Sequence, residues 1–241
     1  MTISFSGAAG QALAAAFKAL KALRPNRPIH PTGVALTGTI ERRPGCVESG
    51  ILWIDSPGPA AVSARLSRSI GMPSGWPDIL GLALRVTTES GPADILLAST
   101  AMSWPGRLML TAHRYASNSK LTSLMPYKGS AGPVLLAARP EATGRGLSAT
   151  PEAFRESLAA GAWTLGLYHA RPTGPWVRFG TLLLTLDPEQ TDLNTRFDPL
   201  RRPLPGAGTY GWAAQLRAPS YQAARQRRPQ PRRQRAPGRS G

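Results

Sequence analysis

Cysteine is nearly missing from this sequence of 241 residues, and long apolar runs are missing altogether. The single cysteine, Cys46, excludes an internal disulfide and any thiolate-clustered metal site, because each needs at least two sulfurs. No apolar stretch approaches the roughly 20 residues that a membrane-spanning helix requires. The first 25 residues lack a basic start, and Lys18 and Lys21 interrupt their Ala/Leu-rich run, so they make a poor secretory signal. We therefore expect a cytoplasmic protein with no membrane partner.

Acidic residues are also scarce, with 13 Asp and Glu against 29 Lys and Arg, which gives a formal net charge of +16. Seven of the arginines follow Tyr221, in a stretch without any acid. Because its end is rich in Pro, Gln and Arg and has no apolar anchors, we expect residues 229–241 to be a disordered tail. Contact between this tail and nucleic acid or an anionic membrane is one alternative function. It leaves residues 24–221 unexplained, so nucleic acid is not predicted as the main partner.

The rest of the composition is typical of a folded protein, with 41% hydrophobic and 17% charged residues. A chain of this length can form one domain around a single core. Apolar residues recur at helical spacing between Ala8 and Leu23, and Pro25 stops that run. The sequence thus predicts an N-terminal helix within residues 1–24 and one domain over residues 25–228.

Short β-prone runs follow this helix and are separated by Gly and Pro clusters. The runs VALTGTIE, GILWID, AAVSARLSR and PVLLAAR predict antiparallel strands, and AWTLGLYHAR and WVRFGTLLLTL predict a long hairpin that turns at residues 172–175. Thr150, Pro151 and Glu152 indicate the start of a helix that ends near Gly161. An irregular connector, TRFDPLRRPLPGAG, precedes a last helix-like piece. Together these elements predict an α+β protein with a β-rich body.

Arg217 and Tyr221 form the first pair of residues whose spacing indicates a chemical function. They lie four positions apart, the spacing that puts two side chains on one face of a helix, so the guanidinium can donate to the phenolic oxygen. A cation at that distance favours the phenolate, which is a hard oxygen donor suited to ferric iron. The alternative is a surface arginine stacked on a tyrosine, and Pro219 between them can bend the helix.

Three ordered segments resemble catalases. FDPLRRPLPGAG followed by QLRAPSYQAARQRR is similar to the segment that leads into the proximal helix with its Arg-x-x-x-Tyr. RPNRPIHPTGVALTGTIE resembles the segment that presents the distal histidine. The stretch from AVSARLSR to ADILLAS is similar to the catalase stretch with Arg-Phe-Ser, then Asp, Gly and Asp-Leu. The matching residues are Arg65, Ser67, Asp78, Gly81 and Asp94.

This resemblance implies an antiparallel β-barrel of the catalase-like type with peripheral helices and a C-terminal helix that carries the haem ligand. The implied cofactor is haem b, and the implied activity is that of a haem-dependent peroxidase or weak catalase acting on hydrogen peroxide or organic hydroperoxides. His30 would take a proton from bound peroxide and return it to the departing oxygen. The residues that the resemblance assigns are His30 and Ser67 for catalysis, Tyr221 as iron ligand with Arg217 as its partner, and Arg27, Arg65 and Arg228 for the haem propionates.

The sequence departs from the catalase pattern at Ala98, where the pattern has an asparagine after Asp-Leu-x-x. Alanine cannot donate a hydrogen bond to peroxide, so we expect weak activity or, as the alternative, a non-catalytic or degenerate haem-binding protein. Ser99 is one residue along the strand and should face the other way. The sequence is also shorter than typical catalases, which leaves a homo-oligomer undecided. His113 and His169 lack comparable context and are predicted to be structural.

Overall fold

The computed structural model describes residues 33–43, 47–141, 146–159, 161–192 and 195–212. The described residues up to Tyr210 belong to one compact unit, and the described residues Gly211 and Trp212 belong to a second. The predicted N-terminal helix, most of the last helix-like piece and the predicted disordered tail lie outside the described residues. Among the residues that are described, no helix is long and apolar enough to cross a membrane.

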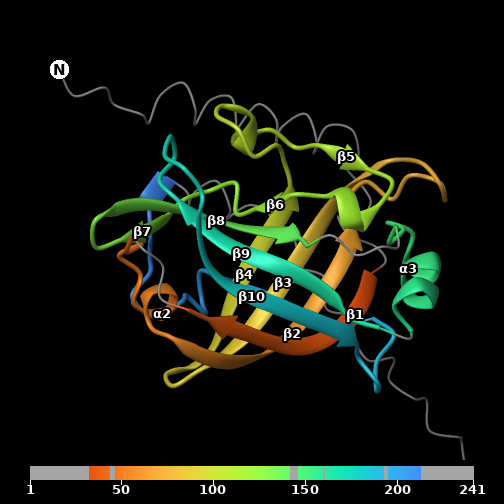
Figure 1. The fold of residues 1–241 in the computed structure, drawn as a ribbon, viewed down its shortest axis with the longest axis horizontal. Coiled ribbons are helices and arrows are strands. Elements are labelled where there is room, and N and C mark those ends of the chain that lie inside the picture. Colours follow the sequence, from red (N-terminus) through yellow and green to blue (C-terminus); the bar gives the residue numbers. More distant parts are fainter. Residues whose placement is uncertain (1–32, 44–46, 142–145, 160, 193–194, 213–241) are drawn as a thin grey trace, which may run out of the picture. The chain divides into compact units, whose positions relative to one another are not determined.

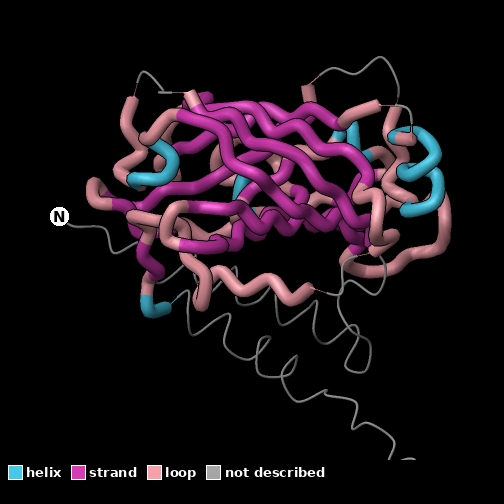
Figure 2. Tube along the Cα trace, turned by 90° about the horizontal axis from the view of Figure 1, so that it is seen from below, coloured by secondary structure: helices cyan, strands magenta, loops and turns pink. Residues whose placement is uncertain are grey.

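A closed antiparallel β-barrel of eight strands dominates the first unit (Figures 1 and 2). Its strands are β1 (Gly33–Arg42), β2 (Gly58–Arg68), β3 (Asp78–Thr88), β4 (Gly91–Ser99), β6 (Leu121–Thr122), β8 (Gly132–Pro140), β9 (Trp163–Ala170) and β10 (Val177–Leu186). They run in the order β8-β6-β4-β3-β2-β1-β10-β9, and pairing of β8 with β9 closes the ring. The predicted β-barrel fold is confirmed.

Short elements complete the unit. The strands β5 (Ala112–His113), β7 (Tyr127–Gly129) and β11 (Gly208–Thr209) pair with β3, β8 and β7, respectively. The helices are α2 (Leu52–Asp55) and α3 (Pro151–Leu158), with the 3-10 turns η1 (Gly106–Leu108) and η2 (Ala116–Asn118).

Alternating side chains fill the barrel interior. On β2, Val62, Ala64 and Leu66 belong to the hydrophobic core, whereas the odd-numbered residues between them face outward. The same alternation places leucines of β3, β9 and β10 inside the barrel. An eight-stranded barrel is just wide enough for its own side chains, and this interior is packed with them.

Two glycines let β1 and β10 approach closely. A Cβ built on Gly38 would lie 1.8 Å from the carbonyl oxygen of Leu183, and one on Gly180 would lie 2.5 Å from that of Glu41. A register shift between Arg178 and Gly180 marks a β-bulge where β10 pairs with its other neighbour, β9. Glycines and bulges at such places allow a sheet to bend into a barrel.

The two α-helices cover opposite ends of the barrel (Figure 1). Phe154 of α3 packs edge-on against Trp163 at 5.5 Å, and Arg155 donates to the carbonyl oxygen of Gly33, where β1 begins. At the other end Trp53 of α2 packs edge-on against Phe179 at 6.5 Å. Helix α3 starts at Pro151, as its sequence predicts.

The prediction of a strand at GILWID is wrong, because Leu52–Asp55 form the single turn α2. The Asp55 carboxylate accepts hydrogen bonds from the backbone N–H groups of Ser49 and Gly50, both at 2.8 Å. These bonds fold the chain back over five or six residues, which an extended strand cannot do. Trp53 and Ile54 are buried by that turn instead of by sheet pairing.

Candidate functional site

Strand register aligns four small residues across neighbouring strands. Gly33 of β1 pairs with Ser67 of β2, Ser67 pairs with Gly81 of β3, and Gly81 pairs with Ala98 of β4. All four occupy outward positions, because their strand neighbours belong to the barrel core. We call these four residues the small-residue row. None of the four residues carries a bulky side chain.

Ser67 is buried and donates a hydrogen bond from its hydroxyl to the carbonyl oxygen of Gly81 at 3.3 Å. Ala98 is half-buried on the other side of Gly81. The row therefore contains one side chain that can form hydrogen bonds and, at position 98, a methyl group that cannot.

Ser99 does not replace the missing donor at position 98. Its hydroxyl oxygen accepts from the backbone N–H of Leu80 at 2.9 Å and donates to the carbonyl oxygen of Thr111 at 2.6 Å. The side chain is fully buried on the opposite side of β4. This confirms the expectation that Ser99 faces away from Ala98.

Arg65 lies two residues before Ser67, on the same outer face, and its charge is matched by a carboxylate that sequence reasoning missed. Its Nε and Nη2 donate to Asp192 at 2.6 and 3.0 Å. Asp192 also accepts from the backbone N–H of Gly33 at 3.0 Å. The guanidinium covers Gly33, since a Cβ there would lie 2.7 Å from the Arg65 Cζ. Asp192 comes from the loop after β10, and nothing in the local sequence indicates this pairing.

Asp94 fixes the connector, residues 195–208, to the outer wall. The buried carboxylate of Asp94 accepts two hydrogen bonds from Arg85, at 2.7 and 2.8 Å, and one from the backbone N–H of Asp198 at 2.7 Å. Arg85 also lies 5.1 Å from the centre of the Phe197 ring. Because Asp94 and Ala98 share the outward face of β4, the connector is held on the same wall as the small-residue row.

Asp78, another residue that matches the catalase pattern, stabilises a turn. Its fully buried carboxylate accepts from the backbone N–H groups of Ile70 and Met72, both at 2.9 Å, and lies 3.4 Å from Arg68 Nε. These contacts hold the turn between β2 and β3.

The described histidines, His113 and His169, are not members of the small-residue row. His169 is buried and faces into the barrel beside Phe179, and its burial lowers its pKa. The Nε2 of His113 is 2.9 Å from the Thr111 hydroxyl, and burial, then the charge of Lys120, lowers its pKa. Within the described ranges, no three His, Cys, Asp or Glu residues are grouped as a metal site.

Catalases are among the solved structures with the same fold. A bacterial catalase matches with a TM-score of 0.58 and 15% identity over 87% of this chain, and a fungal catalase with 0.57 and 14% over 84%. Catalase A from Saccharomyces cerevisiae matches with 0.61 and 13% over 88%. The fold is catalase-like. At these identities the similarity establishes the fold alone.

The catalase-like chain spans 59%, 59% and 63% of the length of those three catalases. No protein-family model matches its sequence. No curated protein sequence matches it either.

The remaining predicted site residues of the catalase-like chain lie outside the described residues, and their roles stay predictions. They are Arg27, His30, Arg217, Tyr221 and Arg228. Of the assigned set, the structure thus places Arg65 and Ser67, and it brings both to one face of the barrel.

Proposed function

We propose that this protein is a haem-dependent peroxidase or weak catalase that acts on hydrogen peroxide or organic hydroperoxides. The observation that carries the proposal is the small-residue row, in which Ser67, matched to the catalase pattern, and Ala98, the position that departs from it, flank Gly81. Arg65 on the same face and the catalase-like barrel support it.

The residues on this wall fit haem in shape and charge. Ser67, Gly81 and Ala98 carry no bulky side chains, which suits a planar macrocycle, and Arg65, whose guanidinium covers Gly33, suits a propionate. A propionate would share Arg65 with Asp192, which already occupies its guanidinium. Tyr221, paired with Arg217, would ligate the iron, and Arg27 and Arg228 would bind propionates. Bound haem would supply a redox-active iron for cleavage of the peroxide O–O bond.

The protein's own residues would move the proton. His30 precedes Gly33 by three residues, and Gly33 pairs with Ser67, so the Ser67 hydroxyl would hydrogen-bond the imidazole. His30 would accept the peroxide proton and return it to the departing oxygen. Ala98 adds no donor, and loss of one such donor lowers rates by about 10²- to 10³-fold in other enzymes. Peroxide turnover would therefore be slow.

A second candidate is a haem-binding protein of the same fold without turnover. Ala98 favours it, because the row holds no second donor for peroxide. Ferric Soret absorbance of the haem-loaded protein, followed by oxygen release and guaiacol oxidation with peroxide, separates the two candidates. Haem binding without either reaction would leave only the second.

Substitution Tyr221→Phe tests the iron ligand. We expect the ferric protein to show a charge-transfer band typical of an iron phenolate, and this band should disappear in Tyr221→Phe because a phenyl ring cannot ligate iron. The measurement is the visible absorbance spectrum at matched haem loading. Tyr115→Phe is the control, since Tyr115 is exposed and distant in sequence. An unchanged spectrum in Tyr221→Phe would refute the ligand assignment.

Substitution Ala98→Asn tests the missing donor. The amide restores a hydrogen-bond donor beside Gly81, so we expect oxygen release from peroxide to rise about tenfold to a hundredfold. Ala98→Leu is the matched control, because it adds similar bulk without a donor. An equal effect of both variants on oxygen release would show that the donor is not what limits the reaction.

A further inference from the structure

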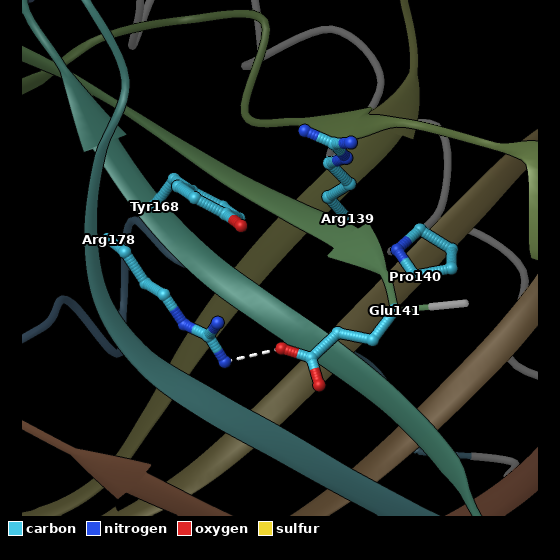
Figure 3. A pocket seen from close by; sticks show the side chains of 5 residues that line it. All are labelled: Arg139, Pro140, Glu141, Tyr168 and Arg178. Atoms are coloured by element: carbon cyan, nitrogen blue, oxygen red, sulfur yellow. Dashed lines mark hydrogen bonds and ion pairs between the residues drawn. The ribbon is translucent and has the colours of Figure 1, made fainter. Parts of the chain in front are cut away.

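We propose that the outer wall of β8, β9 and β10 carries a separate binding site for a small organic anion, either a carboxylate or a phosphate monoester. A pocket of about 370 Å³ lies there, lined by Arg139, Pro140, Glu141, Tyr168 and Arg178 (Figure 3). The inference goes beyond the proposed function, because these strands are not among the four that form the small-residue row.

Strand register builds this pocket from three neighbouring strands. Arg139 of β8 pairs with Gly166 of β9, and Tyr168 of β9 pairs with Arg178 of β10. Arg139, Tyr168 and Arg178 occupy outward positions, because their strand neighbours Ala138, Leu167 and Phe179 belong to the barrel core. The lining side chains therefore belong to rigid strands, apart from Glu141, which directly follows β8.

The pocket contains one uncompensated positive charge. Arg178 forms an ion pair with Glu141 and also donates to the Thr181 hydroxyl at 2.9 Å. That pair is neutral as a unit. The guanidinium of Arg139 makes no hydrogen bond or ion pair within the part of the chain that the structure describes. Among the described lining residues, two arginines and one glutamate thus give a net charge of +1, carried by the exposed Arg139.

Tyr168 adds a directed donor to this charge. Its ring lies along its own strand over Gly166, where a Cβ would be 3.0 Å from both the ring carbon Cε2 and the hydroxyl oxygen. Glycine at this position allows the ring to lie flat. The hydroxyl points into the pocket, between Arg139 and the ion pair (Figure 3), and forms no hydrogen bond to any other described residue.

The ligand class follows from these groups. A guanidinium and a phenolic O–H both donate to oxygen, and arginine binds the paired oxygens of carboxylate and phosphate groups. The volume greatly exceeds the roughly 30 Å³ that one water occupies, so an anionic group and a small organic body both fit. Of the lining residues that the structure describes, Pro140 alone has no ionisable side chain, which disfavours an apolar ligand.

Binding can be measured on the full haem-free chain by NMR titration with methyl phosphate and with acetate at constant ionic strength. Acetamide, which has no charge, is the control ligand. We expect methyl phosphate, acetate or both to bind, and Arg139→Gln to weaken that binding about tenfold or more, since hydrogen bonds to charged groups are the strong ones. Tyr168→Phe should weaken it by a smaller factor. Glu141→Gln should tighten it, because the net charge of the lining rises to +2.

The matched control is Arg114→Gln, which removes an exposed arginine that does not line the pocket. Binding of methyl phosphate alone identifies the ligand class as a phosphate ester, and binding of acetate alone identifies it as a carboxylate. Unchanged affinity in Arg139→Gln, an equal loss in Arg114→Gln, binding of acetamide comparable to acetate, or no binding by either anion would overturn the proposal. Because these titrations need no haem, failure here does not touch the proposed function.

Discussion

Replacement of Asp94 by Asn is expected to destabilise the barrel by about 3 kcal/mol or more, the range seen when one partner of a buried ion pair is removed. The fully buried carboxylate holds Arg85 through two hydrogen bonds and the connector through the N–H of Asp198. An amide carries no charge and offers one acceptor oxygen, so Arg85 would lose its counter-charge. Urea unfolding followed by tryptophan fluorescence measures the change. Limited proteolysis of the connector should also become faster.

Glu141→Gln is the matched control, because it makes the same chemical change in an exposed ion pair. The side chains of Arg178 and Glu141 are 50% and 38% exposed. Exposed pairs contribute about 0–1 kcal/mol, so this variant should unfold almost as the wild type does. Similar unfolding free energies for Asp94→Asn and the wild type would mean that Asp94 does not secure the connector.

Gly38→Ala is expected to cost about 3 kcal/mol or more, at the upper end of overpacking penalties. The new methyl carbon would lie 1.8 Å from the Leu183 carbonyl oxygen, and a backbone atom cannot rotate away as a side chain can. The strands β1 and β10 would have to separate where they pair. The unfolding midpoint in urea and the yield of folded protein both report the effect.

Gly161→Ala makes the same substitution where a Cβ would meet no atom within 4 Å. We expect its unfolding free energy to stay close to that of the wild type. If Gly38→Ala proved equally harmless, the close approach of β1 and β10 would have to be wrong.

Much of the barrel could be predicted from the sequence, because alternating apolar residues and Gly/Pro punctuation are local signals. The hairpin of β9 and β10 is an example, since its turn chemistry lies between two long β-prone runs. The same local signal led to the wrong prediction of a strand at GILWID. Its apolar residues suit a strand, but the hydrogen bonds from the Ser49 and Gly50 N–H groups to the Asp55 carboxylate stabilise a turn instead. Hydrogen bonds of this kind to a side chain produce no periodic pattern in the sequence.

The candidate site was only partly predictable. Family resemblance pointed to Ser67 and Ala98, but only strand register shows that they flank one glycine. The pairing of Arg65 with Asp192 joins residues 127 positions apart, and the Arg139 pocket combines three strands. Contacts between residues so far apart in the sequence depend on how the sheet closes, so no local sequence pattern predicts them.

Each barrel strand contributes side chains to two faces, because alternate residues point into the barrel and onto its outer wall. Leu97 helps to fill the interior, whereas its neighbour Ala98 contributes to the outer wall. An exchange at an outward position that anchors no other segment, such as Ala98, can therefore change the outer wall while the packing of the interior stays intact. Selection can alter the outer wall of such a scaffold one residue at a time without first rebuilding its interior.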